Sequence, residues 1–314
     1  MSKLAVIAIG GNSLIKDEAH QSVSDQFNAV CETAVHIAGM IEQGWNVIVT
    51  HGNGPQVGFV LLRSELASKV MHSVPLDSCG ADTQGAIGYM IQQALYNEFF
   101  RRGIQRHCTT LITQVVVDRN DPAMQNPSKP IGSFYKDEEA RTKMRNDGWI
   151  MVEDAGRGWR RVVPSPIPRE IVERNAIDAL IKSGFIVVAV GGGGIPVLRD
   201  DSGTLSGIEA VIDKDLASSL LASELKADLL LISTAVEKVA LNFKRPDQID
   251  LHHITLNEAK QYFEEGHFAL GSMGPKVKAV INFLERGGRA ALITMPESID
   301  KALKGETGTW IVKE

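Results

Sequence analysis

Apolar runs that stop at glycine clusters are the strongest pattern in this chain. The first run, Ala5 to Ile9, contains no polar residue and breaks off at Gly10-Gly11-Asn12. A β-branched run without polar alternation is typical of a strand buried on both faces, as in parallel sheets. Similar runs predict further strands at residues 45–50, 109–117, 185–190, 228–233 and 289–294. Two of these runs also end in glycine clusters, namely Gly52-Asn53-Gly54 and Gly191 to Gly194.

Amphipathic helices are predicted between these strands. Apolar side chains recur every three or four residues from Phe27 to Ile41 and from Ile87 to Phe99, which places them on one helix face. The second of these helices is predicted to span residues 83–102. Further helices are predicted from Pro55 onward and at residues 169–182, 214–226, 256–265 and 275–286. Strands that alternate with helices predict an α/β protein whose mostly parallel sheet is covered on both faces.

Residues 118–168 break this alternation. The segment holds six of the 12 prolines and two of the four tryptophans, Trp149 and Trp159, with many charges of both signs. Prolines at this density exclude long regular elements. The alternatives are a surface loop and a small folded unit, and the tryptophans favour the folded unit. An insertion of this size beside a glycine-rich site is often a lid.

Composition narrows the class of protein. The chain has 314 residues, of which 44% are hydrophobic and 23% are charged, as in an ordinary globular enzyme of one large or two modest domains. Its formal net charge of −5 argues against general binding to nucleic acid or to anionic membranes. The three cysteines form no CxxC pair, which favours a reducing cytoplasm. No apolar run approaches the length of a membrane span, and the first run lacks the cleavage site of a signal peptide.

The glycine clusters predict a site for a small anion. Ligands of an open α/β sheet sit at the carboxyl ends of the strands, and glycine loops before helices present N–H groups to anions. No GxxxxGK[ST] motif occurs, which excludes a P-loop protein. The glycines from Gly52 to Gly58 have one residue too many for the dinucleotide fingerprint, so a nucleotide-dependent dehydrogenase stays a minor alternative.

Three lysines stand where they could meet such an anion. Lys214 lies at a predicted helix start between two aspartates, and Lys276 follows Gly274-Pro275 at another, where a bare cation is unfavourable. Lys129 stands between two prolines within the predicted lid. Lysines and glycine loops together favour phosphoryl transfer, which requires mainly positioning and charge stabilisation. Neither a Ser-His-Asp set nor a metal cage is evident, so we expect a nucleophile that is already ionised, and we interpret His51 as a hydrogen-bonding turn residue.

These motifs resemble those of the carbamate kinases, within the wider amino-acid kinase family. The similarity runs in order along essentially the whole chain. Its motifs are Ala8-Ile9-Gly10-Gly11-Asn12-Ser13-Leu14, residues 50–58 (THGNGPQVG), 129–132 (KPIG), 189–196 (AVGGGGIP), 209–215 (EAVIDKD), 234–239 (TAVEKV) and 271–276 (GSMGPK). Two positions depart from the family pattern. This chain has Ser13 where the family commonly has alanine, and Gly274 where the family commonly has a larger apolar residue.

The resemblance implies one αβα sandwich of three layers over residues 1–314, with an inserted lid at 118–168 and a homodimer. It also implies phosphoryl transfer between ATP and carbamate, giving ADP and carbamoyl phosphate, with Mg²⁺ carried by the nucleotide and no metal site on the protein. In catabolism of arginine or purines the reaction would run toward ATP. The carbamate side would lie mainly in residues 1–117 and the nucleotide side mainly in residues 169–314.

The resemblance also assigns roles to individual residues. Lys129, Lys214 and Lys276 would neutralise the transferred group, and Asp215 would orient the lysines. The carbamate would be surrounded by Gly10, Gly11, Asn12, Gly52, Asn53 and Gly54. The nucleotide would be bordered by Gly191, Gly192, Ala235, Val236, Met273 and Lys276. Two alternatives stay open beside a carbamate kinase, namely a kinase of another small acid anion and a nucleotide-binding regulator without turnover.

Overall fold

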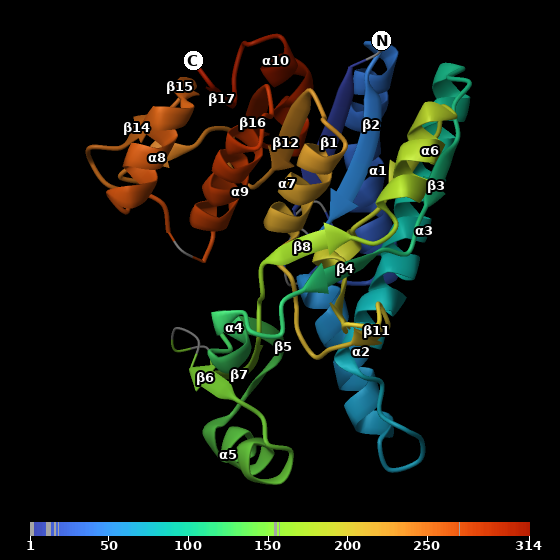
Figure 1. The fold of residues 1–314 in the computed structure, drawn as a ribbon, viewed down its shortest axis with the longest axis vertical. Coiled ribbons are helices and arrows are strands. Elements are labelled where there is room, and N and C mark those ends of the chain that lie inside the picture. The colour runs from blue at the N-terminus through green and yellow to red at the C-terminus, as the bar shows by residue number, and fades with distance from the viewer. Residues whose placement is uncertain are drawn as a thin grey trace.

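A sheet of eight strands forms the centre of the protein (Figure 1). The computed structural model describes residues 3–10, 14, 15, 17, 19–153, 156, 158–269 and 271–314. Along the sheet the strands follow the order β15-β17-β16-β12-β1-β2-β9-β3, and every neighbouring pair is parallel except β16 and β17. Their bounds are β1 Leu4–Ile9, β2 Asn46–His51, β3 Cys108–Thr110, β9 Ile186–Val188, β12 Leu229–Ser233, β15 His253–Thr255, β16 Ala290–Thr294 and β17 Thr309–Val312.

The central strands are buried on both faces because helices cover both sides of the sheet. Along β1, Val6 and Ala8 belong to one apolar cluster, whereas Ala5, Ile7 and Ile9 belong to another on the opposite face. The first cluster includes residues of α6 (Arg174–Lys182), α7 (Lys214–Glu224), α8 (Leu256–Glu264) and α9 (Met273–Glu285). The second includes residues of α1 (Val23–Glu42), α3 (Leu76–Arg102) and α10 (Ile299–Leu303). The predicted αβα sandwich with a mostly parallel sheet is confirmed.

A second, smaller sheet lies at the edge of the main body and leads to the lid. Its four strands follow the order β11-β10-β4-β8, with bounds Leu205–Gly207, Ile195–Arg199, Gln114–Val117 and Pro168–Ile171. The predicted single strand at 109–117 is therefore two strands, β3 and β4, which belong to different sheets. The predicted helix at 169–182 is also partly wrong, because its first residues form β8, which pairs with β4, and only Arg174–Lys182 is helical.

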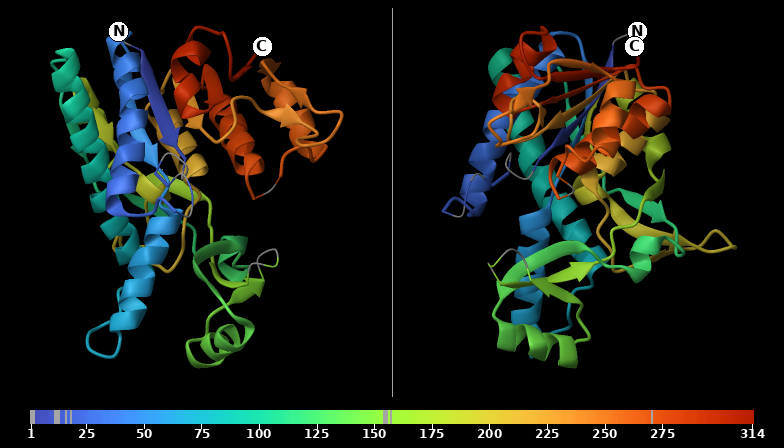
Figure 2. Two further views of the ribbon diagram at one scale, coloured as in Figure 1. Left: turned by 180° about the vertical axis from the view of Figure 1, so that it is seen from behind. Right: turned by 90° about the vertical axis from the view of Figure 1, so that its left-hand side faces the viewer.

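The lid is a folded unit with an antiparallel sheet and its own apolar cluster. It comprises α4 (Pro122–Gln125), β5 (Lys129–Tyr135), α5 (Asp137–Asn146), β6 (Met151–Glu153) and β7 (Trp159–Val163), with strand order β5-β7-β6. Tyr135, Ala140 and Met151 are buried together beneath Trp149 and Trp159. Both views of Figure 2 show this unit protruding from the main body. The lid elements lie within residues 118–168, whose bounds stay a prediction.

The lid rests on α2 (Gly54–Ala67), the helix that follows the second glycine cluster. A Cβ at Gly58 would lie 2.9 Å from the Cα of Gly132, so the two backbones approach as closely as glycine allows. Farther along α2, the carboxylate of Glu65 pairs with the ammonium of Lys143 at 3.2 Å. These contacts fix the lid over the carboxyl ends of the central strands.

Helix starts follow their capping residues. Ser22 and Thr255 each form a capping box, with Asp25 and Glu258 respectively, and Asp213 accepts hydrogen bonds from two N–H groups at the start of α7. α3 begins at Leu76, seven residues before the predicted start. The two remaining strands, β13 (Ala240–Leu241) and β14 (Ile249–Asp250), form a separate pair. Among the described residues, no helix has both the length and the apolar character needed to cross a membrane.

The contact between α3 and β3 tolerates no side chain at Gly88. A Cβ at this position would lie 2.2 Å from Cγ2 of Thr110, whereas a Cβ at Gly80 of the same helix would meet nothing within 4 Å. We expect Gly88→Ala to lower the free energy of unfolding by about 1–3 kcal/mol through overpacking. We expect the matched control Gly80→Ala to raise it by up to about 1 kcal/mol, because alanine favours the helix. Urea denaturation of both variants checks this, and equal stabilities would contradict it.

Candidate active site

Two large cavities open at the carboxyl ends of the central strands. The first, here called the C-terminal cavity, has a volume of about 960 Å³ and is lined chiefly by residues 233–245 and 265–276. The second, the lid cavity, measures about 870 Å³ and lies between the lid, the loop at Gly52–Pro55 and residues 211–216. The two cavities share four of their lining residues, namely Lys214, Gly271, Ser272 and Lys276. A ligand in one cavity would therefore meet a ligand in the other at Lys214 and Lys276.

Asp215 holds these two lysines. Its Oδ1 accepts a hydrogen bond from Nζ of Lys214 at 2.5 Å, and its Oδ2 accepts one from Nζ of Lys276 at 3.1 Å. The Asp215 side chain is only 3% exposed. Burial alone would raise the pKa of this carboxyl group, but the charges of Lys214 and Lys276 outweigh burial and lower it. Burial lowers the pKa of Lys214, the nearby charge of Lys276 lowers it further, and Asp215 opposes both effects.

The local sequence explains how the trio of Lys214, Asp215 and Lys276 forms. Lys214 and Asp215 are the first two residues of α7, and Lys276 lies in the first turn of α9, where Pro275 fits the helix start. α7 and α9 pack side by side on one face of the sheet. An aspartate at a helix N-terminus is favourable because it faces the positive end of the helix dipole, whereas a lysine there is not. Asp215 therefore compensates for two cations placed against helix starts.

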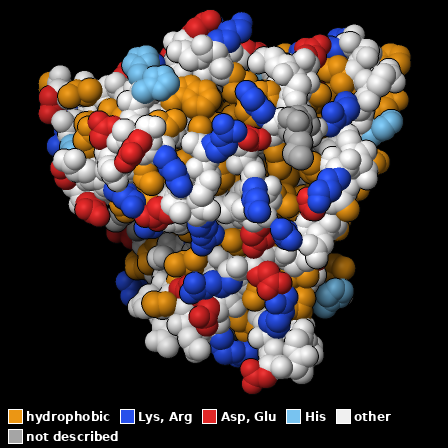
Figure 3. All heavy atoms as spheres, turned by 45° about the horizontal axis from the view of Figure 1, so that its top comes forward, with side chains coloured by type: hydrophobic (Ala, Val, Ile, Leu, Met, Phe, Trp, Pro, Cys, Tyr) orange, Lys and Arg blue, Asp and Glu red, His pale blue; other side chains and the backbone are white. Residues whose placement is uncertain are grey.

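A third lysine reaches the lid cavity from the lid itself. Lys129, the first residue of β5, lines this cavity, and its Nζ lies 3.0 Å from Oδ2 of Asp213. Arg160 of β7 lines the same cavity and donates a hydrogen bond to the carbonyl of Gly132. Figure 3 shows Lys and Arg side chains over the middle of the face where the main body meets the lid. The lid cavity is therefore suited to an anion.

Glycine and asparagine form the opposite wall of the lid cavity. Gly52, Asn53 and Gly54 all line it. The amide of Asn53 donates to Oγ1 of Thr83 at 2.8 Å, and a Cβ at Gly192 would lie 2.2 Å from the same amide nitrogen. This wall contributes little side-chain bulk, so it favours a small ligand.

The third glycine cluster supports this wall from behind. A Cβ at Gly191 would lie 2.3 Å from Nε2 of His51, and Nε2 of Gln84 donates to the carbonyl of Gly191 at 3.0 Å. Val190, which precedes the cluster, has φ 54°, a strained value for a β-branched residue. Its N–H is satisfied by Oγ1 of Thr113 at 3.0 Å. The strain is thus confined to a fully buried, hydrogen-bonded turn beside the cavity.

Most of the predicted site residues come together, but not all in the expected places. Gly192 lines the lid cavity rather than the C-terminal cavity, and Gly191 lines neither. Gly10 lines the C-terminal cavity instead of the lid cavity, because β1 ends beside Ser233 of β12. Gly11 and Asn12 lie outside the described residues. The remaining predicted residues line one or both cavities, with Lys129, Asp215, Gly52, Asn53 and Gly54 in the lid cavity, Ala235, Val236 and Met273 in the C-terminal cavity, and Lys214 and Lys276 in both. Their roles stay a prediction.

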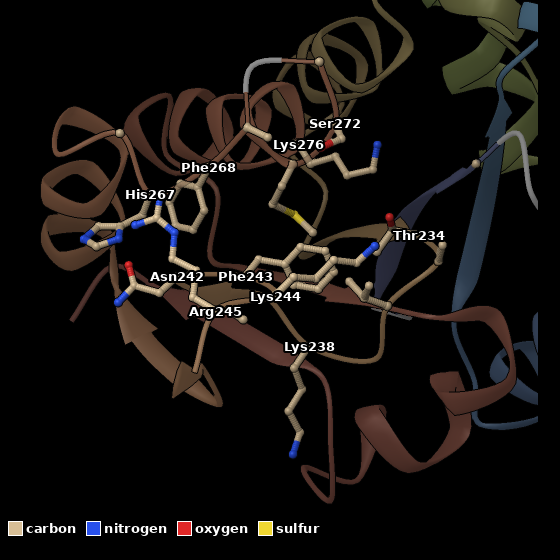
Figure 4. Close-up of a pocket in the computed structure, with 18 of the residues that line it drawn as sticks. Thr234, Lys238, Asn242, Phe243, Lys244, Arg245, His267, Phe268, Ser272 and Lys276 are labelled. Atoms are coloured by element: carbon tan, nitrogen blue, oxygen red, sulfur yellow. The ribbon is translucent and has the colours of Figure 1, made fainter. Parts of the chain in front are cut away.

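Aromatic side chains line part of the C-terminal cavity. Figure 4 shows the side chains of Phe243, Arg245 and Phe268 around it, contributed by two separate loops. Lys238 lines the cavity but its side chain extends away from these residues in Figure 4, and its Nζ lies 2.8 Å from Nε2 of His252. A cavity lined by both aromatic rings and ammonium groups suits a ligand with a flat apolar part and an anionic part.

Gly274, where the sequence is expected to depart from the family pattern, fits its surroundings. A Cβ there would lie 3.0 Å from the carbonyl oxygen of Ala269, which accepts a hydrogen bond from the N–H of Gly274 at 2.9 Å.

Among the described residues, no group of three or more His, Cys, Asp or Glu side chains could hold a metal ion.

Sequence reasoning missed several residues of these cavities, among them Asp213, Arg160, Phe243 and Phe268. Asp213 carried a signal, since an aspartate directly before a helical pattern is a common N-cap. Arg160, Phe243 and Phe268 carried none, because their positions depend on how the lid and the 240–270 segment fold over the sheet ends.

Comparison with known proteins identifies the family. The family model described as the amino acid kinase family matches residues 3–295. The chain belongs to this family. The carbamate kinase of Thermococcus kodakarensis is 50% identical over 315 residues, covering 99% of this chain and 100% of its relative. The carbamate kinase-like protein YahI of Escherichia coli K12 is 50% identical over 316 residues, covering all of both chains.

Solved structures agree with the family. The carbamate kinase of Giardia lamblia bound to AMP-PNP has a TM-score of 0.94 and 44% identity, and the match covers 100% of this chain and 99% of that one. A match of this quality extends over the lid as well as the main body of the amino acid kinase fold. The resemblance to carbamate kinases that the motifs predicted is confirmed.

Because His51 is buried, its contribution to the free energy of unfolding should depend on pH. The ring is fully buried, its Nδ1 donates to the carbonyl of Gly52 at 3.0 Å, and burial lowers its pKa from 6.5 to about 4, with the charge of Lys214 contributing. In the unfolded chain His51 binds a proton below pH 6.5, whereas in the folded protein it binds one only below about pH 4. Its contribution is therefore present above pH 6.5 and is lost as the pH falls toward 4.

We expect this loss to approach about 3 kcal/mol in the free energy of unfolding. The measurement is urea denaturation of the wild type and His51→Gln between pH 7.5 and 4.5, because the difference between the two proteins removes the effect of other groups. The stability advantage of the wild type should shrink as the pH falls. An advantage that stays constant over this range would show that His51 is not held neutral.

Proposed function

We propose that this chain is a carbamate kinase, a phosphotransferase that moves the terminal phosphoryl group between ATP and carbamate. The observation that supports this most strongly is the junction of the two cavities at Lys214 and Lys276, which Asp215 holds in place. Full-length relatives named carbamate kinases, at about 50% identity, support the same reaction. Phosphoryl transfer needs cations at the point where the two substrates meet, and this junction supplies them.

The lid cavity is the proposed acceptor site. Its wall of Gly52, Asn53 and Gly54 leaves little room for recognition by side chains, which suits an acceptor as small as carbamate. Lys129 faces the same space from the lid. A kinase of a larger acid anion would need groups that recognise the rest of its acceptor. Gly11 and Asn12, which follow the end of β1, are proposed to complete this site.

The C-terminal cavity is the proposed nucleotide site. Phe243 and Phe268 would border the base, Ala235, Val236 and Met273 the rest of the nucleoside, and Lys214 with Lys276 the phosphates. The Giardia lamblia relative was solved with AMP-PNP bound, which supports nucleotide use. Both carboxylates near the junction, Asp213 and Asp215, already pair with lysines, so Mg²⁺ would be carried by the nucleotide phosphates, where it screens their charge.

The reaction then needs no general base. A carbamate oxygen is already anionic, so it forms a bond to the terminal phosphorus while the bond from that phosphorus to the bridging oxygen of ADP breaks. No proton has to move. Lys214 and Lys276 would stabilise the charge on the transferred group, and Lys129 would approach it from the acceptor side. Asp215 keeps both lysines of the junction aimed at the same point. The His51 ring, which burial holds neutral, has no part in this chemistry.

Removal of Lys214 should abolish most of the activity. We expect Lys214→Ala to lower kcat by roughly 10²–10⁴-fold, as for loss of a group that stabilises the transition state. The assay is ATP formation from ADP, Mg²⁺ and carbamoyl phosphate. The matched control is Lys182→Ala, which removes an exposed lysine paired with Asp178 on α6 and should leave the rate unchanged. A Lys214→Ala enzyme with near wild-type activity would show that the site is misplaced.

The same assay separates the alternatives. ADP binding by the wild type without ATP formation would refute the kinase and favour a nucleotide-binding regulator. Activity with acetyl phosphate but not with carbamoyl phosphate would favour a kinase of another small acid anion. Carbamoyl phosphate is a mixed anhydride of a carboxylic and a phosphoric acid, so we propose that the cell uses the reaction toward ATP, in catabolism. A reducing cytoplasm is the proposed setting, since Cys31, Cys79 and Cys108 are all free thiols.

A homodimer is proposed through the outer face of α3. Tyr89, Tyr96 and Phe100 stand seven and four residues apart, so they share one helix face, and they are 62%, 64% and 82% exposed. Val35 of the adjoining α1 is also partly exposed. Large exposed aromatic side chains on one face mark a protein interface. In Figure 1, α3 lies on the side of the molecule opposite the C-terminal elements α8 and β14.

Charge on this face should separate the subunits. We expect the double variant Tyr96→Glu and Phe100→Glu to elute as a monomer, because burying carboxylates at an apolar interface is unfavourable. The control is Ile249→Glu, which places the same charge on an exposed apolar residue of β14. Size-exclusion chromatography with light scattering gives the mass of each protein. A double variant that remains dimeric, or a wild type that is monomeric, would refute this interface.

A further inference from the structure

Asp213 has two separate tasks, one for each carboxylate oxygen. Oδ1 accepts hydrogen bonds from the N–H groups of Asp215 at 3.0 Å and Leu216 at 3.4 Å, which caps α7. Oδ2 lies 3.0 Å from Nζ of Lys129. The side chain is mostly buried, at 15% exposed, whereas that of Lys129 is 37% exposed. Capping alone does not require a charge, since Asn and Ser cap helices as well as Asp does.

The segment that ends in Asp213 is tied to the lid at other points. The N–H of Val211 donates to the carbonyl of Pro164 at 2.9 Å, and Glu209 pairs with Arg161 of β7 at 2.9 Å. Lys129 begins β5, the strand paired with β7. The ion pair from Asp213 to Lys129 is thus the charged part of this lid attachment that lies within the lid cavity.

Charges in the cavity explain why a carboxylate is placed here. Asp215 pairs with both Lys214 and Lys276, so neither of its oxygens is left for Lys129. A lysine side chain has four rotatable bonds, and without a partner its ammonium group would sample many positions at the edge of the cavity. Asp213 restricts Lys129 to the side of the cavity that faces α7.

We infer that Asp213 is a positioning residue, which acts through Lys129 by holding the lid and its ammonium group over the acceptor cavity before the substrates arrive. This inference rests on the proposed phosphotransferase function. It links the first turn of α7, where Lys214 and Asp215 lie, directly to the lid. The single side chain of Asp213 would then fix the position of Lys129 relative to Lys214 and Lys276.

A double-mutant cycle tests this inference. Asp213→Asn keeps a cap for α7 but removes the charge, and we expect it to lower kcat/KM for carbamoyl phosphate by about 3- to 10-fold, as for the freedom regained by one long side chain. In a Lys129→Gln background the same change should have no further effect. The matched control is Asp178→Asn, which removes an exposed Asp–Lys pair on α6 and should leave kcat/KM unchanged.

Hydrogen exchange of the ligand-free protein gives a second readout that needs no turnover. In Asp213→Asn the amides of β5 and β7 should exchange faster, whereas those in the first turns of α7 should not change because the cap is retained. In Asp213→Ser the hydroxyl can cap α7 but does not reach Lys129, so this variant should show the same exchange pattern as Asp213→Asn. It replaces Asp213→Asn if that variant does not fold.

Three outcomes would overturn the inference, namely unchanged kcat/KM in Asp213→Asn, an equal loss in the Lys129→Gln background, or faster exchange confined to α7. If the wild type forms no ATP, the proposed function fails, and the exchange of β5 and β7 alone decides the role of Asp213.

Discussion

The ion pairs of Asp215 with Lys214 and Lys276 are the constraint on which the site depends. Two ammonium groups this close repel each other, and both stand at helix starts, where the helix dipole disfavours them. A single buried carboxylate compensates for both, which is why its pKa stays low despite burial. Buried ion pairs seldom stabilise a fold relative to apolar packing, so this arrangement is better explained by what the lysines do than by stability.

The topology of the sheet brings this trio together. α7 and α9 contribute the three residues and pack side by side, and each is followed by a strand of the central sheet, β12 and β16, which pair in parallel. Parallel strands connected by helices place their loops at the same edge, so residues 61 positions apart, Asp215 and Lys276, meet there. The lid arises from an insertion between β4 and β8 of the smaller sheet, which carries Lys129 toward the same edge from outside.

Local patterns in the sequence were enough to predict the central strands and most covering helices, because burial on both faces leaves a continuous apolar run. They were not enough where pairing is decided by distant segments. Residues 169–171 follow a helical pattern into α6, yet they form a strand because β4 offers them a partner. The short strands β13 and β14 have only two residues each, too few to form a recognisable apolar pattern. In each case tertiary context overrides local propensity.

In the candidate site too, local sequence patterns predicted some features, whereas contacts with distant segments decided others. Glycine clusters and the Lys-Asp pattern pointed to residues that line the two cavities, since the chemistry of glycine and lysine can be interpreted without knowing their neighbours. Which cavity each glycine faces depended on backbone packing that no local pattern contains. Gly191 had to be glycine because His51 occupies the space of its side chain, and Gly192 because Asn53 does. The third cluster thus supports the wall of the lid cavity through steric fit, although its sequence resembles a phosphate-binding loop.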